Sequence, residues 1–135
     1  MKQLNTVLLI DDDETTNYLN HRLLTRMEIA SDIRVVTDGE EALTYLSKAF
    51  AGAEDYPRPN LIFVDIKMSG MDGFEFLEEY QKVTAGNKEG TVMLMLTSSA
   101  SFYDLEKLKQ FPDVRRHYSK PLTESDVREI IQTYF

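Results

Sequence analysis

The sequence contains no cysteine and no tryptophan, and none of its apolar runs is long. Without cysteine the chain can form neither a disulfide nor a thiolate metal site, which excludes a zinc finger and leaves the redox compartment open. No apolar stretch approaches the roughly 20 residues of a membrane helix, and the N-terminus lacks the apolar region of a signal peptide. These absences predict a soluble cytoplasmic protein with no membrane contact.

Positive charge is also scarce. The 15 lysine and arginine residues are outnumbered by 23 aspartate and glutamate residues, so the formal net charge is −8 at pH 7. A chain of this charge repels nucleic acid unless its basic residues gather in a patch. They are scattered, with Arg115-Arg116 as the densest pair, and we expect no direct nucleic-acid binding.

Length and composition fit one compact domain. The chain has 135 residues, of which 42% are hydrophobic, and this suits a single core. No repeat, low-complexity tract or domain boundary interrupts it. We therefore expect one domain over residues 1–135.

Short apolar runs alternate with segments in which apolar residues recur at the spacing of a helix face. The runs predict strands over residues 6–10, 33–36, 61–64, 92–96 and 117–119, the last mainly because an alternating pattern has to return to the sheet. The periodic segments predict helices over residues 15–27, 39–50, 73–80 and 102–111, and a final helix that is capped by 123–126 and reaches 134. Five βα units with right-handed crossovers give a doubly wound α/β fold with a parallel sheet.

Individual residues indicate where several of these helices and loops lie. Loops are expected over residues 51–60 and 85–90, which contain glycine or proline. Pro112 is expected to end the fourth helix, because proline cannot continue one. In the first helix, the spacing predicts a buried face made of Leu19, Leu23, Leu24 and Met27.

Carboxylates stand where two of these strands end. Asp65 closes the third apolar run, and the cluster Asp11-Asp12-Asp13-Glu14 follows the first. The carboxyl ends of parallel strands share one edge of a sheet, and ligands bind in the crevice outside that edge. The two groups of acids are therefore expected to be neighbours in space. Thr97 follows the fourth run and Lys120 the fifth, at the same edge.

This ordered set resembles the receiver domain of bacterial response regulators. The resemblance covers essentially the whole chain and includes Met71-Asp72-Gly73 behind the acceptor and Lys120-Pro121 after the last strand. It implies a flavodoxin-like (βα)5 fold with five parallel strands in the order 2-1-3-4-5. It also implies a stand-alone, regulatory phosphoacceptor switch rather than an enzyme, because the chain ends soon after its last helix. The implied partner is a sensor histidine kinase or a histidine phosphotransfer protein, while the downstream target stays unknown.

The resemblance also assigns roles to residues. Asp65 is the phosphoacceptor, Asp11 and Asp12 hold Mg²⁺, Thr97 binds a phosphoryl oxygen, and Lys120 pairs with the phosphate. Neighbouring carboxylates repel by roughly 4 kcal/mol per pair at an effective dielectric near 20, which invites a cation. Oxygen-only ligands favour Mg²⁺, which suits Asp12 and Asp65 as direct ligands, Asp11 through a water, and the backbone carbonyl of Lys67 as a further ligand.

Two positions depart from the family pattern. The family commonly has a proline after the first methionine of the acceptor loop, whereas here Met68 is followed by Ser69-Gly70, which predicts a more mobile loop. The family usually places an aromatic residue three positions before the lysine, and here that position is His117. Thr97 and His117 are therefore the expected switch residues.

Other interpretations stay open at this point. The pattern Asp11-x-Asp13-x-Thr15 also fits the nucleophile motif of haloacid-dehalogenase-type phosphatases, with Asp11 as the nucleophile. The acidic run could simply favour a helix N-terminus, and Asp72-Gly73 is expected to be a turn or cap. Thr97 could cap a helix that starts at Ser101, with Ser98 or Ser99 as the active hydroxyl instead. An interaction module that does not depend on phosphorylation is the third possibility.

Overall fold

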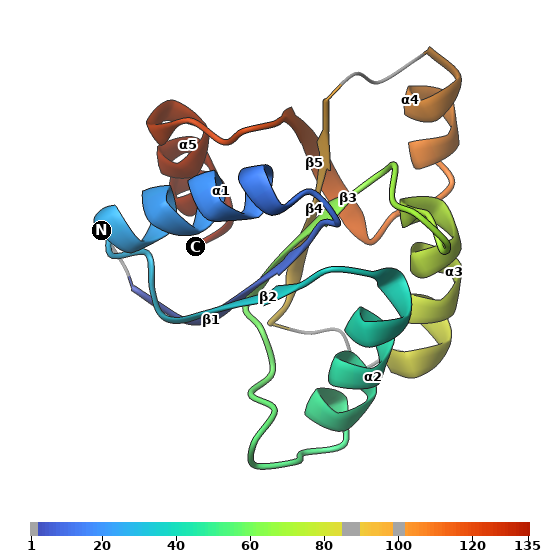
Figure 1. Ribbon diagram of the computed structural model, residues 1–135, viewed down its shortest axis with the longest axis horizontal. Coiled ribbons are helices and arrows are strands. Elements are labelled where there is room, and N and C mark those ends of the chain that lie inside the picture. Colours follow the sequence, from blue (N-terminus) through green and yellow to red (C-terminus); the bar gives the residue numbers. More distant parts are fainter. Residues whose placement is uncertain (1–2, 85–89, 99–101) are drawn as a thin grey trace.

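The computed structural model describes residues 3–84, 90–98 and 102–135 (Figure 1). Within these ranges strands and helices alternate: β1 (Leu4–Ile10), α1 (Glu14–Arg26), β2 (Ala30–Val36), α2 (Gly39–Phe50), β3 (Leu61–Asp65), α3 (Gly73–Thr84), β4 (Val92–Thr97), α4 (Phe102–Leu108), β5 (Val114–Ser119) and α5 (Glu124–Tyr134). The strands pair in parallel in the order β2-β1-β3-β4-β5, which confirms the predicted fold and strand order. Residues 85–89 of the loop predicted over 85–90, and Ser101, where Thr97 could cap a helix, lie outside the described residues.

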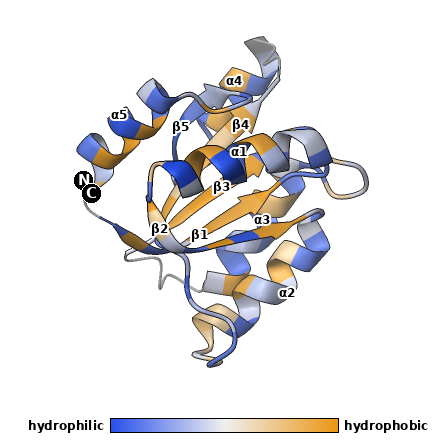
Figure 2. Cartoon of the chain, turned by 60° about the vertical axis from the view of Figure 1, so that its left-hand side comes forward, coloured by the Kyte–Doolittle hydropathy of each residue, from blue (hydrophilic) through white to orange (hydrophobic). Residues whose placement is uncertain are grey.

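The sheet is covered by helices on both faces. Helices α1 and α5 lie on one face, and α2, α3 and α4 lie on the other (Figure 1). Figure 2 shows that β1, β3 and β4 are mostly hydrophobic, while the helices have hydrophobic and hydrophilic sides. Each face therefore has its own core, one containing Leu24 and Ile130 and the other Leu46 and Phe76. No helix in the described ranges is long and apolar enough to span a membrane.

Strand β3 lies at the centre of the sheet and is buried throughout. Its side chains alternate between the two cores: Phe63 packs with the α1 and α5 side, while Ile62 and Val64 pack with the α2 and α3 side. A shift by one residue would exchange these faces, so the register is strongly determined. The same alternation fixes the position of Asp65 at the end of the strand.

The edge strands are longer than their apolar runs suggest. Strand β2 begins at Ala30 and β5 at Val114, because edge strands expose polar residues such as Arg115 and Arg116 that interrupt an apolar pattern. Helix α4 ends at Leu108 rather than at Pro112. A turn closed by the N–H of Phe111 on the carbonyl of Leu108 follows it at 3.0 Å.

The buried face of α1 differs from the prediction. Leu23 and Leu24 are buried, but Leu19 is 40% exposed and the polar residues Asn17 and Asn20 are buried instead. The helix is thus rotated so that its N-terminal half turns amide side chains inward. Leucine spacing alone could not show this, because both sets of residues have helical periodicity.

Side chains cap the starts of α2 and α5, and the cap of α5 confirms the prediction at 123–126. The carboxylate of Asp38 accepts the N–H of Glu41 at 2.7 Å at the start of α2. Thr123 and Asp126 form a reciprocal capping box at α5.

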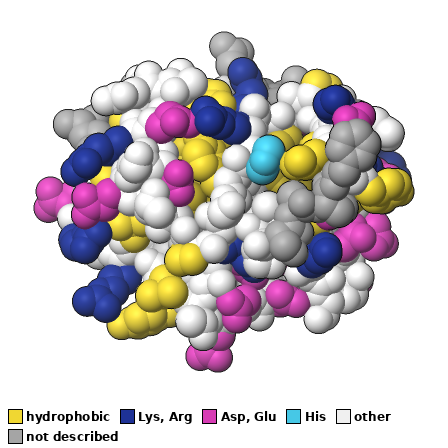
Figure 3. Space-filling view, turned by 90° about the horizontal axis from the view of Figure 1, so that it is seen from above, with side chains coloured by type: hydrophobic (Ala, Val, Ile, Leu, Met, Phe, Trp, Pro, Cys, Tyr) yellow, Lys and Arg dark blue, Asp and Glu magenta, His cyan; other side chains and the backbone are white. Residues whose placement is uncertain are grey.

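Charges of both signs are mixed on the surface. On the face seen in Figure 3, lysine and arginine side chains are interspersed with aspartate and glutamate side chains. Arg26 and Arg128 both contact Glu124, and Arg116 contacts Glu129. Exposed pairs of this kind contribute about 0–1 kcal/mol each, so they neutralise charge locally more than they stabilise the fold.

Candidate functional site

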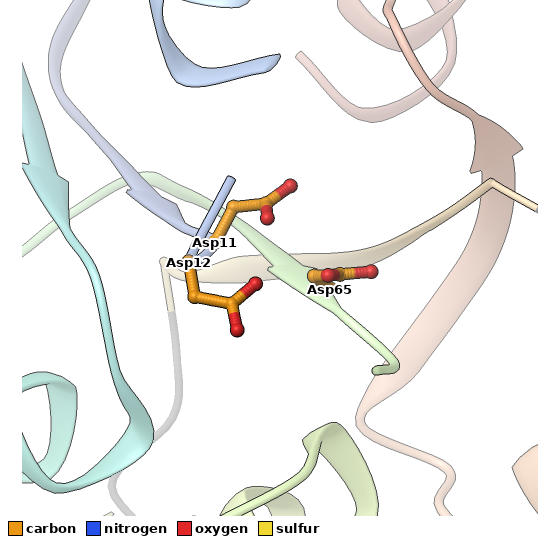
Figure 4. A group of neighbouring side chains, drawn as sticks. All are labelled: Asp11, Asp12 and Asp65. Carbon is orange, nitrogen blue, oxygen red and sulfur yellow. The ribbon is translucent and has the colours of Figure 1, made fainter. Parts of the chain in front are cut away.

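Three carboxylates converge at the carboxyl edge of the sheet. Asp65 is the last residue of β3 and is 3% exposed, and Asp11 directly follows β1 and is 2% exposed. Asp12 is exposed at the start of the next turn. Figure 4 shows the three side chains at the ends of these adjacent strands. Each offers an oxygen atom that lies within 4.8 Å of the others, as the strand-end positions predict.

The turn between β1 and α1 is fixed by its own polar groups. The N–H of Asp13 donates to Oδ1 of Asp11 at 2.9 Å, and the amide of Asn17 donates to the backbone carbonyl of Asp11 at 2.8 Å. The carboxylate of Asp13 accepts the N–H of Thr16 and thereby caps α1. The fourth acid, Glu14, belongs to the first turn of α1. The acidic run therefore combines two site residues with two helix-terminus residues.

The loop after Asp65 contacts Asp12. The backbone N–H of Ser69 donates to Oδ2 of Asp12 at 2.8 Å. Gly70 adopts a φ of 75°, which favours glycine. A proline at residue 69 would have no N–H to donate, so the departure from the family pattern creates this contact.

Gly73 allows α3 to approach the backbone of Asp65 closely. A Cβ atom at this position would lie 2.5 Å from the carbonyl oxygen of Asp65 and 2.9 Å from Cα of Ile66. The N–H of Gly73 donates to the carbonyl of Ile66 at 2.8 Å. The carboxylate of Asp72 does cap α3 by accepting the N–H of Glu75 at 2.9 Å. Gly73, the residue beside it, lets α3 pack directly against the backbone of Asp65.

Lys120 joins the two strand ends. Its amine donates to Oδ2 of Asp11 at 3.1 Å and to Oδ2 of Asp65 at 3.2 Å, and its side chain is 10% exposed. Its backbone N–H donates to the carbonyl of Thr97 at 3.0 Å. The following peptide bond to Pro121 is cis. The predicted set Asp11, Asp12, Asp65, Thr97 and Lys120 is therefore assembled at one place.

The buried acids and the lysine shift one another's ionisation. Burial and the charge of Asp11 raise the pKa of Asp65 to about 6, against the opposing effect of Lys120. Burial lowers the pKa of Lys120, but its hydrogen bonds and the charges of Asp11 and Asp65 outweigh this and hold the pKa above its ordinary value. At neutral pH the site thus presents an ionised Asp65 beside a protonated amine.

Comparison with known proteins agrees with this geometry. The family model of the response regulator receiver domain matches residues 7–132. The chain belongs to the response regulator receiver domain family. Receiver domains are regulatory parts of two-component signalling systems, and the phosphatase interpretation with Asp11 as nucleophile is not favoured. In that motif Asp13 would be a site residue, whereas here it caps α1.

Individual relatives support the same assignment. A two-component response regulator from Cytophaga hutchinsonii is 28% identical, with a TM-score of 0.86, over 97% of this chain and 96% of that one. The receiver domain of the histidine kinase CKI1 from Arabidopsis thaliana, in complex with Mg²⁺ and BeF₃⁻, is 23% identical, with a TM-score of 0.80, over 95% and 90% of the two chains. Hybrid signal transduction histidine kinase L from Dictyostelium discoideum is 27% identical over 98% of this chain, which spans only 7% of that kinase.

The residue at the end of β4 is a buried threonine. Thr97 is 5% exposed and pairs with Ser119 of β5. Ser98 is exposed, and Ser99 lies outside the described residues. Of the two described hydroxyl residues, Thr97 is thus the one that belongs to the strand end next to Asp65.

Side chains on the two faces of β5 lie next to different helices. His117 is exposed and lines a cleft with Leu105 and Leu108 of α4. Tyr118 is buried, and its hydroxyl donates to Glu129 of α5 at 2.9 Å. This is the arrangement that strand alternation predicts. The receiver's histidine thus lies on the same side of β5 as the helix that follows Thr97.

Sequence reasoning missed three contributors, namely Asn17, Asn20 and the backbone of Ser69, and it named Gly73 only as part of a motif and of a turn or cap. Asparagines are usually exposed, so two of them spaced three apart on the same helix as Leu23 and Leu24 could have indicated buried polar contacts. A glycine at the first position of a helix is a weak signal of close packing. The Ser69 contact left no signal in the sequence, because its donor is a backbone group.

Proposed function

We propose that this receiver takes a phosphoryl group onto Asp65 from a phosphohistidine, carried by a sensor histidine kinase or a histidine phosphotransfer protein. One observation carries the proposal. The buried carboxylate of Asp65 lies between the amine of Lys120, at 3.2 Å, and the oxygens of Asp11 and Asp12. A nucleophile is thus held between a cation and a cluster of oxygen ligands.

The donor set fits Mg²⁺. Carboxylate oxygens are the ligands that Mg²⁺ prefers, and it keeps several waters while binding one or two carboxylates. We assign Asp12 and Asp65 as direct ligands, Asp11 through a water, and the backbone carbonyl of Lys67 as a further ligand. When bound, Mg²⁺ would offset negative charge shared by the carboxylates and the phosphoryl oxygens. The Mg²⁺ complex of the CKI1 receiver domain supports this choice.

The transfer step needs an ionised acceptor and a nearby cation. An oxygen of Asp65 forms a bond to phosphorus as the bond from phosphorus to the donor imidazole nitrogen breaks, and the electron pair of that bond stays on the imidazole. The pKa of Asp65, about 6, leaves the carboxylate ionised at neutral pH. Lys120 stabilises charge on the phosphoryl oxygens, and Thr97 donates a hydrogen bond to one of them. The protein therefore contributes by positioning the reacting groups and by stabilising the charge on the phosphoryl oxygens.

The signal is read at the carboxyl ends of β4 and β5, on the same edge of the sheet. A phosphoryl group adds about −1.5 to −2 charge at Asp65, and Thr97 and Lys120 move to meet it. The bond from the N–H of Lys120 to the carbonyl of Thr97 links these two movements. The chain runs from Thr97 into α4 and from β5 into Lys120, and His117 of β5 fills space that Thr97 leaves. A target protein reads the altered face of α4, β5 and α5.

The first test is phosphorylation by a small donor. Acetyl phosphate with Mg²⁺ should add one phosphoryl group to the wild-type chain, and Asp65→Asn should abolish this addition. Asp72→Asn is the matched control, because it removes a nearby carboxylate that caps α3 and should leave phosphorylation intact. Intact mass and peptide mapping of the acyl phosphate give the readout. Label on Asp11 that survives Asp65→Asn would overturn the proposal in favour of the phosphatase.

A further inference from the structure

Helix α1 buries two asparagines that the transfer step does not use. Asn17 is 6% exposed and Asn20 is 1% exposed. Residues three apart lie on the same face of a helix, and this face is turned toward the protein interior. Burying an amide side chain is unfavourable unless it finds hydrogen-bond partners. The identity of those partners therefore indicates why amides are present.

Both asparagines bind the backbone of loops that carry site residues. The amide of Asn17 donates to the carbonyl of Asp11 at 2.8 Å. The side-chain oxygen of Asn20 accepts the N–H of Leu122 at 2.9 Å, across 102 positions of sequence. Leu122 stands two residues after Lys120. One face of one helix thus contacts both the loop of the metal-binding acids and the loop of the phosphate-binding lysine.

The loop after β5 has few backbone donors with which to fix Lys120. The N–H of Lys120 itself is bound to the carbonyl of Thr97. Pro121 has no N–H, so the next donor along the chain is that of Leu122. Asn20 binds this donor. The backbone of Lys120 is therefore held on one side by β4 and on the other by α1.

We propose that Asn20 is a positioning residue for Lys120, and that Asn17 plays the same part for Asp11. Helix α1 is then a rigid element that sets the distance between the cation and the carboxylates of the site. This inference rests on the proposed function. A purely structural role would predict lower stability without selective effects, whereas the positioning role predicts that the two asparagines affect different steps.

The experiment compares Asn20→Leu with Asn17→Leu. Leucine fills a similar volume but cannot bind the loop backbone. Asn20→Leu should slow phosphorylation by acetyl phosphate at saturating Mg²⁺ by about 10-fold to 100-fold, because small displacements of catalytic groups have effects of this size. Its Mg²⁺ dissociation constant should stay within about twofold of wild type, since all the carboxylate ligands keep their contacts. Asn17→Leu should instead raise the Mg²⁺ dissociation constant by about 10-fold.

Two controls separate position from stability. Leu24→Ala removes a fully buried apolar side chain from the same helix, and no hydrogen bond to either loop is lost with it. It should lower the melting temperature and leave both readouts unchanged below the transition. Asn20→Ala cannot overpack the site, and it should reproduce the kinetic effect of Asn20→Leu if that variant folds poorly.

A double variant identifies the residue through which Asn20 acts. In a Lys120→Ala background, Asn20→Leu should cause no further loss of rate, because the side chain it positions is already gone. An equal loss in both backgrounds, or a normal rate in Asn20→Leu and Asn20→Ala, overturns the positioning role while wild type is still phosphorylated on Asp65. A wild type that takes no phosphoryl group at all overturns the proposed function, and the positioning role with it.

Discussion

The carboxylate side of the site, at the ends of β1 and β3, and the switch side, at the ends of β4 and β5, are built from different contacts. On the carboxylate side, the N–H groups of Asp13 and Ser69 donate to Asp11 and Asp12. On the switch side, the N–H of Lys120 donates to the carbonyl of Thr97, and His117 is exposed and lines a cleft beside α4. Lys120 contacts both sides. The carboxylate side is thus fixed by backbone donors that bind its side chains, whereas the switch side exposes a side chain at a cleft.

The largest expected effect comes from removing one residue from each side. Asp12→Ala should weaken Mg²⁺ binding by more than about 10-fold, since even residues behind the direct ligands contribute this much. Lys120→Ala should leave Mg²⁺ bound but slow phosphorylation by about 100-fold or more, because a preorganised charge is lost from the transition state. Mg²⁺ titration by calorimetry or tyrosine fluorescence and transfer rates provide the two readouts.

Two results would contradict this comparison of the carboxylate side with the switch side. Equal Mg²⁺ affinity in wild type and Asp12→Ala would contradict the assignment of Asp12 as a ligand. A strong loss of affinity in Lys120→Ala would show that the two sides are not separable.

A smaller effect is expected at the support of Asp65. Gly73→Ala places a methyl group 2.5 Å from the carbonyl of Asp65, so α3 must move, and we expect a loss of about 1–3 kcal/mol in the free energy of unfolding. The displaced acceptor should also be phosphorylated more slowly. Chemical denaturation and transfer rates measure the two effects.

Gly70→Ala is the matched control in the same loop. Its φ of 75° makes alanine unfavourable, but its added methyl group meets no atom within 4 Å. It should lower stability by about 1–2 kcal/mol and leave the transfer rate nearly unchanged. Equal rates in both glycine variants would show that contact with α3 does not position Asp65.

A further expected effect concerns stability against pH without Mg²⁺. The pKa of Asp65 is raised to about 6 in the folded state, so the folded chain binds this proton more tightly than the unfolded chain does. Stability of the wild type is therefore lost as pH rises from about 4 through about 6. Asp65→Asn lacks this ionisation, and its melting temperature relative to wild type should increase over the same range.

The control for this measurement is Glu78→Gln, which removes an exposed carboxylate from α3. It accounts for the loss of one negative charge. A melting-temperature difference between wild type and Asp65→Asn that does not change from pH 4 to pH 8 would contradict the raised pKa. Saturating Mg²⁺ should reduce the difference, because the ion stabilises the ionised carboxylate.

The fold and the core of the site were predictable because they depend on patterns that repeat. Strand β3 and the acids at its end follow from an apolar run that stops at Asp65, and parallel strands bring such ends together. The edge strands were less visible, since half of β5 is exposed and polar, and α4 ended early because a turn after Leu108 replaced its last residues.

The supports of the site were not predictable from the same patterns. Asn20 binds a backbone N–H that lies 102 positions away, and sequence spacing gives no measure of such a contact. Leu19 and Asn20 are adjacent in α1, so the rotation of the helix decides which of them is buried. That rotation depends on whether an apolar core or an unpaired backbone group lies opposite. Only the packed structure contains that information.

The contact between Ser69 and Asp12 has a consequence for mutational scanning. Because the donor is a backbone amide, every substitution at residue 69 keeps it except proline, which has no N–H. An alanine scan would therefore record this position as tolerant and overlook its role. Proline is the one residue at this position that would remove the contact.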